Sequence, residues 1–311
     1  MTTNGSGPNY QPAPATEGTG PANGSGLAPG SVPGQLPFTP QKIGRVITIT
    51  SGKGGVGKTT TTANLGTALA QLGRKVVVID ADIGLRNLDV VMGLEKRIVY
   101  DIVDVVEGRC RIRQALIKDK RFPELYLLPA AQTRDKSAVN PAQMRLLCDH
   151  LKSEFDFVLV DCPAGIEQGF KNAIAGADAV IIVTTPEVSA VQDADRVIGL
   201  VEANGLPSPR LVINRIRPEL VRRGEMMTQQ DVVEILAVDL IGIVPDDESI
   251  VISTNRGEAA VTDRTSRAGL AYIHIARRLL GEEVPFLDLA TAGGWLDRML
   301  KRLAGGGRPA R

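Results

Sequence analysis

The sequence predicts an α/β protein with a doubly wound, mostly parallel sheet and helices on both of its faces. Three observations lead to this prediction. Short aliphatic runs recur along the chain, helical stretches separate them, and most of the runs are solid rather than alternating in hydropathy. Solid runs are typical of strands buried on both faces, and strands that alternate with helices form right-handed crossovers in a parallel sheet.

Each element follows from its local pattern. Apolar runs predict seven strands, at 45–50, 75–80, 125–130, 157–161, 179–185, 210–215 and 240–245. Helical patterns predict a helix after the first strand that stops at Gly73, followed by helices at 141–152, 189–203, 229–237 and 264–280. A glycine is a common residue just after the end of a helix. No period of 20 to 50 residues repeats, which argues against a solenoid.

The first 42 residues differ in composition from the rest of the chain. Gly, Pro, Ser, Thr, Asn and Ala dominate them, and Glu17 is the only charged side chain between Met1 and Pro40. We expect a disordered Gly/Pro/Ser-rich extension over 1–42, because such a segment has too few apolar groups to form a core. It has neither the apolar run of a secretory signal nor the arginines of a transit peptide. Residues 43–285 are predicted to form one continuous domain.

The composition excludes several classes of protein. Net charge is +1, so a protein that coats nucleic acid over its whole surface is not indicated. The three cysteines are scattered without a CxxC pair, which argues against a disulfide framework or a metal cage and fits a reducing cytoplasm. No run approaches the roughly 18–20 apolar residues of a membrane span.

The stretch SGKGGVGKTT at 51–60 carries a phosphate-binding pattern. Gly52 and Gly57-Lys58-Thr59 match G-x-x-x-x-G-K-[ST], between a predicted strand and a predicted helix. Such glycines let backbone N–H groups cradle phosphate oxygens at a helix N-terminus. Lys58 would then reach the β- and γ-phosphates and the Thr59 hydroxyl would ligate Mg²⁺. The alternative is a glycine-rich turn that binds no ligand. Lys53 has no duty in this pattern within a single chain.

Carboxylates follow two of the predicted strands. Asp80 and Asp82 end the second strand, and Asp161 ends the run FVLV as a Walker-B aspartate does. Because ligands bind beyond the carboxyl ends of parallel strands, these groups should converge on the phosphate loop. Magnesium-dependent phosphoryl transfer needs such carboxylates. Each of them could instead cap a helix N-terminus. His150 and His274 both fall in helical stretches and are interpreted as ordinary helix residues.

Several phrases of the sequence point to a known family. The phrases KGGVGKTT (53–60), VVVIDADIGLRNLD (76–89) and LVDCPAGIE (159–167) resemble the MinD/ParA family of deviant Walker A P-loop ATPases. QALIKDKR, LLPAAQTRDK and VPDDESI narrow the resemblance to its septum-site-determining members, over about 45–302. The resemblance implies a P-loop ATPase domain at 43–285 that uses ATP and Mg²⁺ and hydrolyses ATP.

The resemblance also implies residue roles. Lys53 would reach across a homodimer of ATP-bound subunits to the partner's phosphates, where a cation offsets charge that develops in the transition state. Lys53, Lys58, Asp82 and Asp161 would be catalytic, with Asp82 orienting the attacking water. Thr59 would ligate Mg²⁺ directly, and Asp82 and Asp161 through water. The implied nucleotide-binding residues are Lys53, Gly54, Gly55, Val56, Gly57, Lys58, Thr59, Thr60, Asp80, Asn214, Arg215, Pro245 and Asp247.

Residues 286–311 are predicted to be a linker and a short amphipathic helix. Five apolar side chains gather on one side of this helix: Trp295, Leu296, Met299, Leu300 and Leu303. From Gly293 onward five basic side chains and Asp297 give a local charge of +4. This pattern is typical of a helix that lies on an anionic membrane surface. The alternative is a terminal helix docked on its own core.

The expected function is therefore that of an ATPase whose binding to the membrane is switched by ATP. ATP-bound dimers would sit on the inner face of the cell membrane, place the division septum, recruit a MinC-type division inhibitor, and return to the cytoplasm after a MinE-type activator stimulates hydrolysis. Asp193 and Asp195, in the predicted helix 189–203, are candidate partner contacts or else part of a solvated face. Alternatives are a flagellar-number regulator, a ParA-type partitioning ATPase that binds DNA, and a scaffold that binds nucleotide without hydrolysis. No specific nucleic acid is expected.

Overall fold

The computed structural model describes Met1 and residues 43–288, and it contains every strand that the sequence predicts. The predictions for the extension over 1–42 and for the helix at 294–304 lie outside the described residues. The strands are β1 (Arg45–Thr50), β2 (Val76–Asp80), β3 (Ile117–Lys118), β4 (Leu125–Leu128), β5 (Phe157–Asp161), β6 (Ala179–Thr184), β7 (Arg210–Ile216) and β8 (Leu240–Pro245).

The helices alternate with these strands. They are α1 (Lys58–Gln71), α2 (Leu88–Met92), α3 (Ile102–Val106), α4 (Ile112–Ala115), α5 (Pro141–Lys152), α6 (Gln168–Ile174), α7 (Val188–Ala203), α8 (Pro218–Arg222), α9 (Gln229–Leu236), α10 (Glu248–Asn255) and α11 (Arg267–Leu279). Short 3₁₀ helices are η1 (Glu95–Arg97), η2 (Lys136–Ala138) and η3 (Ala260–Thr262). The sequence did not predict α2, α3, α4, α6, α8 and α10. The first five have four to seven residues, less than two helical turns. Helix α10 is as long as the predicted α9, but its apolar residues form the run 250–252 instead of recurring at helical spacing.

The eight strands form one sheet in the order β3-β4-β2-β5-β1-β6-β7-β8. All neighbouring pairs are parallel except β3 with β4, where a two-residue edge strand runs antiparallel. This edge strand was not predicted, since two residues carry no periodicity. The mostly parallel, doubly wound fold class is confirmed. The register of β2 with β5 sets Asp80 beside Asp161, which places two carboxyl groups together at the carboxyl edge.

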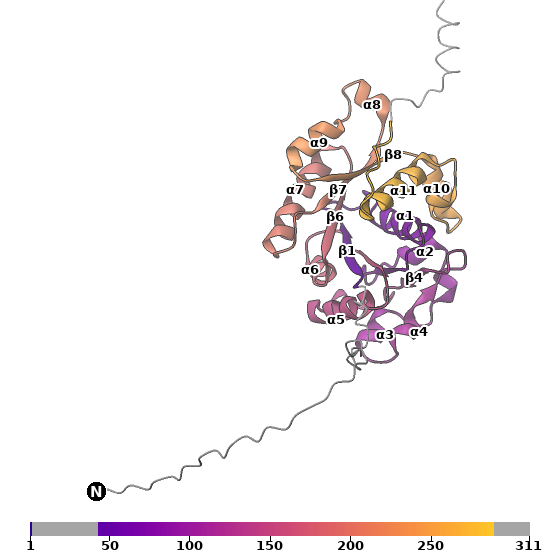
Figure 1. Ribbon diagram of the computed structural model, residues 1–311, viewed down its shortest axis with the longest axis vertical. Coiled ribbons are helices and arrows are strands. Elements are labelled where there is room, and N and C mark those ends of the chain that lie inside the picture. Colours follow the sequence, from indigo (N-terminus) through magenta and orange to yellow (C-terminus); the bar gives the residue numbers. More distant parts are fainter. Residues whose placement is uncertain (2–42, 289–311) are drawn as a thin grey trace, which may run out of the picture. The chain divides into compact units, whose positions relative to one another are not determined.

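Helices cover both faces of the sheet (Figure 1). Successive strand residues point to opposite faces, so Val77 packs into one core and Val78 into the other. The first core contains side chains of α3, α5, α6, α7 and α9, and the second contains those of α1, α2 and α11. Among the described residues, no helix has the length and apolar character needed to cross a bilayer.

Candidate nucleotide-binding site

The loop between β1 and α1 has the backbone of an anion-binding turn. Gly55 and Gly57 have φ of 77° and 103°, a backbone conformation that residues other than glycine rarely adopt. Gly57 is the N-cap of α1, and no side chain caps this helix end. The first N–H groups of α1 are therefore left for a ligand, at the positive end of the helix dipole.

Asn214 of β7 braces this loop from the side. Its Nδ2 donates a 2.7 Å hydrogen bond to the Val56 carbonyl oxygen. A Cβ added at Gly57 would lie only 2.3 Å from the same Nδ2. The loop therefore needs glycine at position 57 for two reasons, its left-handed backbone and the close approach of Asn214.

The two lysines of the loop have different surroundings. The Lys58 ammonium is buried and donates to Ser51 Oγ at 3.0 Å, within the loop itself. The Lys53 ammonium lies outside the loop, where it donates to Ser189 Oγ at 3.1 Å and pairs with the Glu187 carboxylate at 3.5 Å. The Lys53 side chain is 43% exposed. One lysine thus belongs to the loop's own cradle and the other to its rim.

Asp161 lies beneath the start of α1. Burial raises the pKa of its carboxyl group to about 7, and the neighbouring Asp80 charge adds to the shift. Hydrogen bonds from the Thr59 and Thr62 hydroxyls and the charge of Lys58 act in the opposite direction. The Thr62 hydroxyl lies 3.2 Å from Asp161 Oδ1. The hydrogen bonds and the Lys58 charge therefore offset only part of the cost of burying the Asp161 carboxylate.

Asp80 is a support for the loop that follows β2. Its carboxylate accepts hydrogen bonds from the backbone N–H groups of Asp82 at 3.0 Å, Asn87 at 3.2 Å and Leu88 at 3.1 Å. Burial raises the pKa of Asp80 to about 6, although the hydrogen bonds from Asp82 and Leu88 lower it. Asp82 is half-buried, two residues beyond the end of β2. The geometry makes Asp80 a positioning residue for Asp82.

The residues at this edge fit a magnesium ion that arrives with a nucleotide. Within the described ranges, no group of three or more His, Cys, Asp or Glu side chains could hold a metal ion by itself. Mg²⁺ is usually held by one or two carboxylates together with substrate phosphates rather than by a protein cage. Asp161 beside the Thr59 hydroxyl matches this donor set, and a divalent cation would offset the proximity of two buried carboxyl groups.

A cavity of about 280 Å³ opens beside the phosphate loop. Gly57, Asn214, Arg215, Pro245 and Asp247 all contribute to its lining, so the structure brings these five implied nucleotide-binding residues together. Arg215 has φ of 56°, at a register irregularity between β7 and β8. A non-glycine residue in this region stores strain, and the irregularity leaves the Arg215 side chain exposed beside the cavity.

Asp247 also has a structural duty. Its carboxylate accepts hydrogen bonds from Ser249 N at 2.9 Å, Ala268 N at 3.0 Å and Ser266 Oγ at 3.2 Å. It therefore caps α10 and ties that helix to the start of α11. Burial would raise the pKa of Asp247, but these hydrogen bonds hold it below its usual value.

Helix α7 passes directly behind the phosphate loop. A Cβ added at Gly52 would lie 2.1 Å from the Asp193 carbonyl oxygen, so the two backbones are in close contact. The Asp193 side chain pairs with Arg196 at 3.4 Å, and Asp195 is exposed. Any partner that binds α7 near these aspartates would therefore lie close to the nucleotide loop.

Four residues near this site were missed by the sequence reasoning: Ser51, Thr62, Glu187 and Ser189. Thr62 could have been found, because it follows Thr59 by three residues and so shares its helix face. Ser51 could have been found as well, because it opens the stretch SGKGGVGKTT. Glu187 and Ser189 carry no signal in the local pattern, since Lys53 and Ser189 are 136 residues apart. The predicted membrane residues Trp295, Leu296, Met299, Leu300 and Leu303 lie outside the described residues.

The chain matches one family model and is similar in sequence to several known proteins. Residues 44–204 match a family model described as an AAA domain. The septum site-determining protein MinD of Synechocystis is 58% identical over 266 residues, which cover 85% of this chain and 100% of that protein. MinD of Bacillus subtilis is 61% identical over 245 residues, which cover 78% and 91% of the two chains.

Solved structures agree. A MinC:MinD cell division protein complex from Aquifex aeolicus contains a chain that is 51% identical, with a TM-score of 0.74 over 78% of this chain and 99% of that one. MinD of Pyrococcus horikoshii, complexed with Mg-ADP, is 32% identical with a TM-score of 0.70 over 76% and 95%. The resemblance inferred from the sequence is confirmed, and the chain belongs to the MinD family of septum site-determining P-loop ATPases.

Proposed function

We propose that this ATPase uses ATP to form a homodimer whose two subunits complete each other's sites, and that dimerisation places it on the membrane. One observation carries the proposal. Two lysines of a single loop are separated, with Lys58 inside the cradle and Lys53 on its exposed rim beside Glu187 and Ser189. An exposed ion pair of this kind contributes only about 0.2–1 kcal/mol, so little holds Lys53 in place. It is available to a second subunit's phosphates.

Hydrolysis then follows from residues that converge at the sheet edge. Asp82, fixed through Asp80, orients a water whose oxygen attacks the γ-phosphorus while the bond to the β–γ bridging oxygen breaks. The leaving β-phosphate takes up negative charge, and the proton of the water passes to phosphate. Lys58 from the same subunit and Lys53 from the other stabilise that charge. Thr59 would hold Mg²⁺ directly, and Asp82 and Asp161 would hold it through water, where the ion would supply further charge neutralisation.

The C-terminal tail makes membrane binding depend on dimerisation. A helix of fewer than about 12 residues is marginal in water, so the segment around Trp295–Leu303 must fold as it binds lipid. One such segment binds weakly, because burial of five apolar side chains is offset by ordering costs. Two tails on one dimer gain avidity, by roughly 10²–10⁴. ATP would thus move the protein to the inner face of the membrane without changing the tail.

Partners follow from the family. The Aquifex relative forms a complex with MinC, which supports a MinC-type inhibitor as partner of this chain. The close approach of α7 to Gly52 supports Asp193 and Asp195 as contacts that also sense the nucleotide loop. A MinE-type activator that binds there would act on hydrolysis directly. This combination, a membrane-bound ATPase with an inhibitor and an activator, would position the septum.

Liposome sedimentation tests the proposal, with ATP, with ADP and without nucleotide. Wild type should pellet with anionic vesicles only with ATP, and a chain ending at Ala292 should stay in the supernatant in all three states. Lys53→Ala should lose ATP-dependent dimerisation, turnover and pelleting together, while its thermal stability stays near that of wild type. Equal pelleting of wild type in all three states would refute the ATP switch. A Lys53→Ala chain that dimerises and hydrolyses normally would refute the cross-subunit role.

A further inference from the structure

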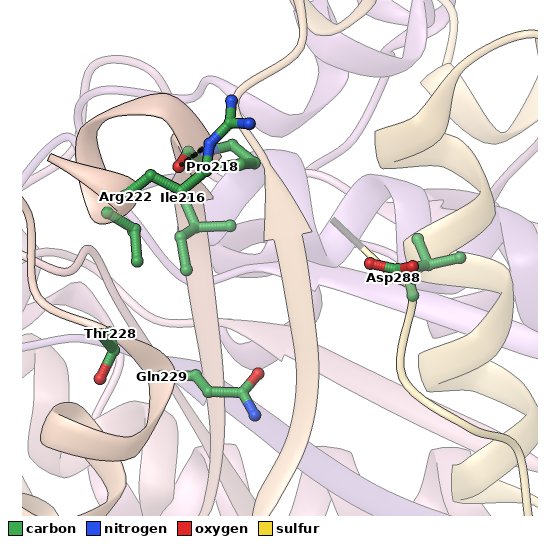
Figure 2. Close-up of a pocket in the computed structure, with 8 residues that line it drawn as sticks. Ile216, Pro218, Arg222, Thr228, Gln229 and Asp288 are labelled. Carbon is green, nitrogen blue, oxygen red and sulfur yellow. Dashed lines mark hydrogen bonds between the residues drawn. The ribbon is translucent and has the colours of Figure 1, made fainter. Parts of the chain in front are cut away.

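A second cavity, of about 320 Å³, lies beside the point where the described chain ends. Its wall is mostly apolar and is formed by the end of β7, by α8, by the start of α9 and by the C-terminal segment. Figure 2 shows Ile216 and Gln229 on one side and Asp288 on the other. Ile216 follows Arg215, which lines the nucleotide-side cavity, so neighbouring residues of β7 line the two cavities.

The start of the tail is fixed at this cavity. Arg278 of α11 donates to the carbonyl oxygens of Val284 and Pro285, both at 2.9 Å, and its guanidinium lies 4.2 Å from the centre of the Phe286 ring. Arg267 donates to the Asp288 carbonyl oxygen at 3.0 Å. Residues 289–311 therefore leave from the cavity wall itself.

The tail has the length to reach the cavity. Trp295 is seven positions beyond Asp288 in the sequence, and at roughly 3.3–3.6 Å per residue this stretch spans up to about 25 Å. The first apolar residues of the amphipathic segment, Trp295 and Leu296, can thus return to the cavity wall.

We infer that, away from membranes, Trp295 and Leu296 of the chain's own tail occupy this cavity. The inference rests on the proposed function in taking the tail as the membrane-binding segment. Docking competes with lipid, because a tail that sits in the cavity cannot insert into a bilayer. A tail that is docked about nine-tenths of the time has its apparent membrane affinity lowered about tenfold. Docking would thus hold a single subunit in solution and strengthen the dependence of membrane binding on two tails.

Intrinsic fluorescence tests docking directly, because Trp295 is the single tryptophan of the chain. We expect Trp295 of the nucleotide-free, lipid-free chain to emit at shorter wavelength, and to be quenched less by acrylamide, than a synthetic peptide of residues 289–311. Val221→Gln in the cavity wall should move both quantities toward the peptide values. Val99→Gln is the matched control, since Val99 is 78% exposed and lies outside the cavity. Gln adds polarity without charge, which leaves vesicle electrostatics unchanged.

Three results would overturn the inference. Wild-type emission and quenching equal to those of the peptide would show that the tail does not dock. Protection of Trp295 that Val221→Gln leaves unchanged would place the tail elsewhere. An unchanged affinity of Val221→Gln for anionic vesicles would exclude competition, since a fall of the docked fraction to one half should raise that affinity about fivefold. Protected Trp295 in a chain that shows no ATP-dependent pelleting would support docking while refuting the proposed function.

Discussion

The contact between Gly57 and Asn214 yields the sharpest prediction, the substitution Gly57→Ala. The new methyl group would lie 2.3 Å from Asn214 Nδ2, and the backbone at φ of 103° is strained for alanine. We expect about 1–3 kcal/mol of backbone strain. To avoid the methyl group, Asn214 must also give up its 2.7 Å bond to the Val56 carbonyl, which adds about 1–2 kcal/mol. The free energy of unfolding should therefore fall by about 2–5 kcal/mol.

A double-mutant cycle separates these two contributions. In an Asn214→Ala background the clash is absent, so Gly57→Ala should cost only its backbone strain, and the coupling energy should be about 1–2 kcal/mol. Gly55→Ala is the control, because Gly55 also has positive φ but nothing lies within 4 Å of its added Cβ. Urea denaturation without nucleotide measures all four chains of the cycle and the control. Equal costs of Gly57→Ala in both backgrounds would refute the bracing role of Asn214.

Three further predictions follow from the site and its surroundings. Asp80→Ala should lower the free energy of unfolding by about 1–3 kcal/mol and slow ATP turnover, because three backbone N–H groups in the loop after β2 lose their acceptor. The control is Asp101→Ala, which removes the N-cap of α3 and should lower the free energy of unfolding by about 1 kcal/mol without changing turnover. ADP should raise the thermal midpoint more with Mg²⁺ than with EDTA, and an equal rise would argue against a metal beside Asp161. Burial and two nearby arginines lower the pKa of His274, so the folded state binds its proton less readily than the unfolded state, and the His274 contribution to stability should fall as pH drops through 6.5. Asp80 and Asp161, whose pKa values are raised, contribute in the opposite direction. Relative to wild type, His274→Gln should therefore gain stability as pH drops through 6.5 in denaturation series, and an unchanged difference between the two chains would exclude a His274 contribution.

The sequence determined the fold class because burial on both faces forces solid aliphatic runs, and all seven predicted strands are present. It also located the phosphate loop, since glycine and lysine spacing is a local property of the chain. The edge strand β3 and the five helices of four to seven residues were not predicted, because so few residues carry too little periodicity. Helix α10 was not predicted because its apolar residues are consecutive.

What only the tertiary structure decided is how these groups pair across long stretches of chain. The resemblance implied chemical roles for Asp80 and Lys53, yet the sequence left open whether Asp80 was a helix cap and could not name a resting partner for Lys53. The fold sets the Asp80 carboxyl group beside Asp161 of β5 and the Lys53 ammonium against Ser189 and Glu187. The physical reason is that strand register and crossovers, which no local pattern encodes, bring residues that are far apart in the sequence to one edge of the sheet.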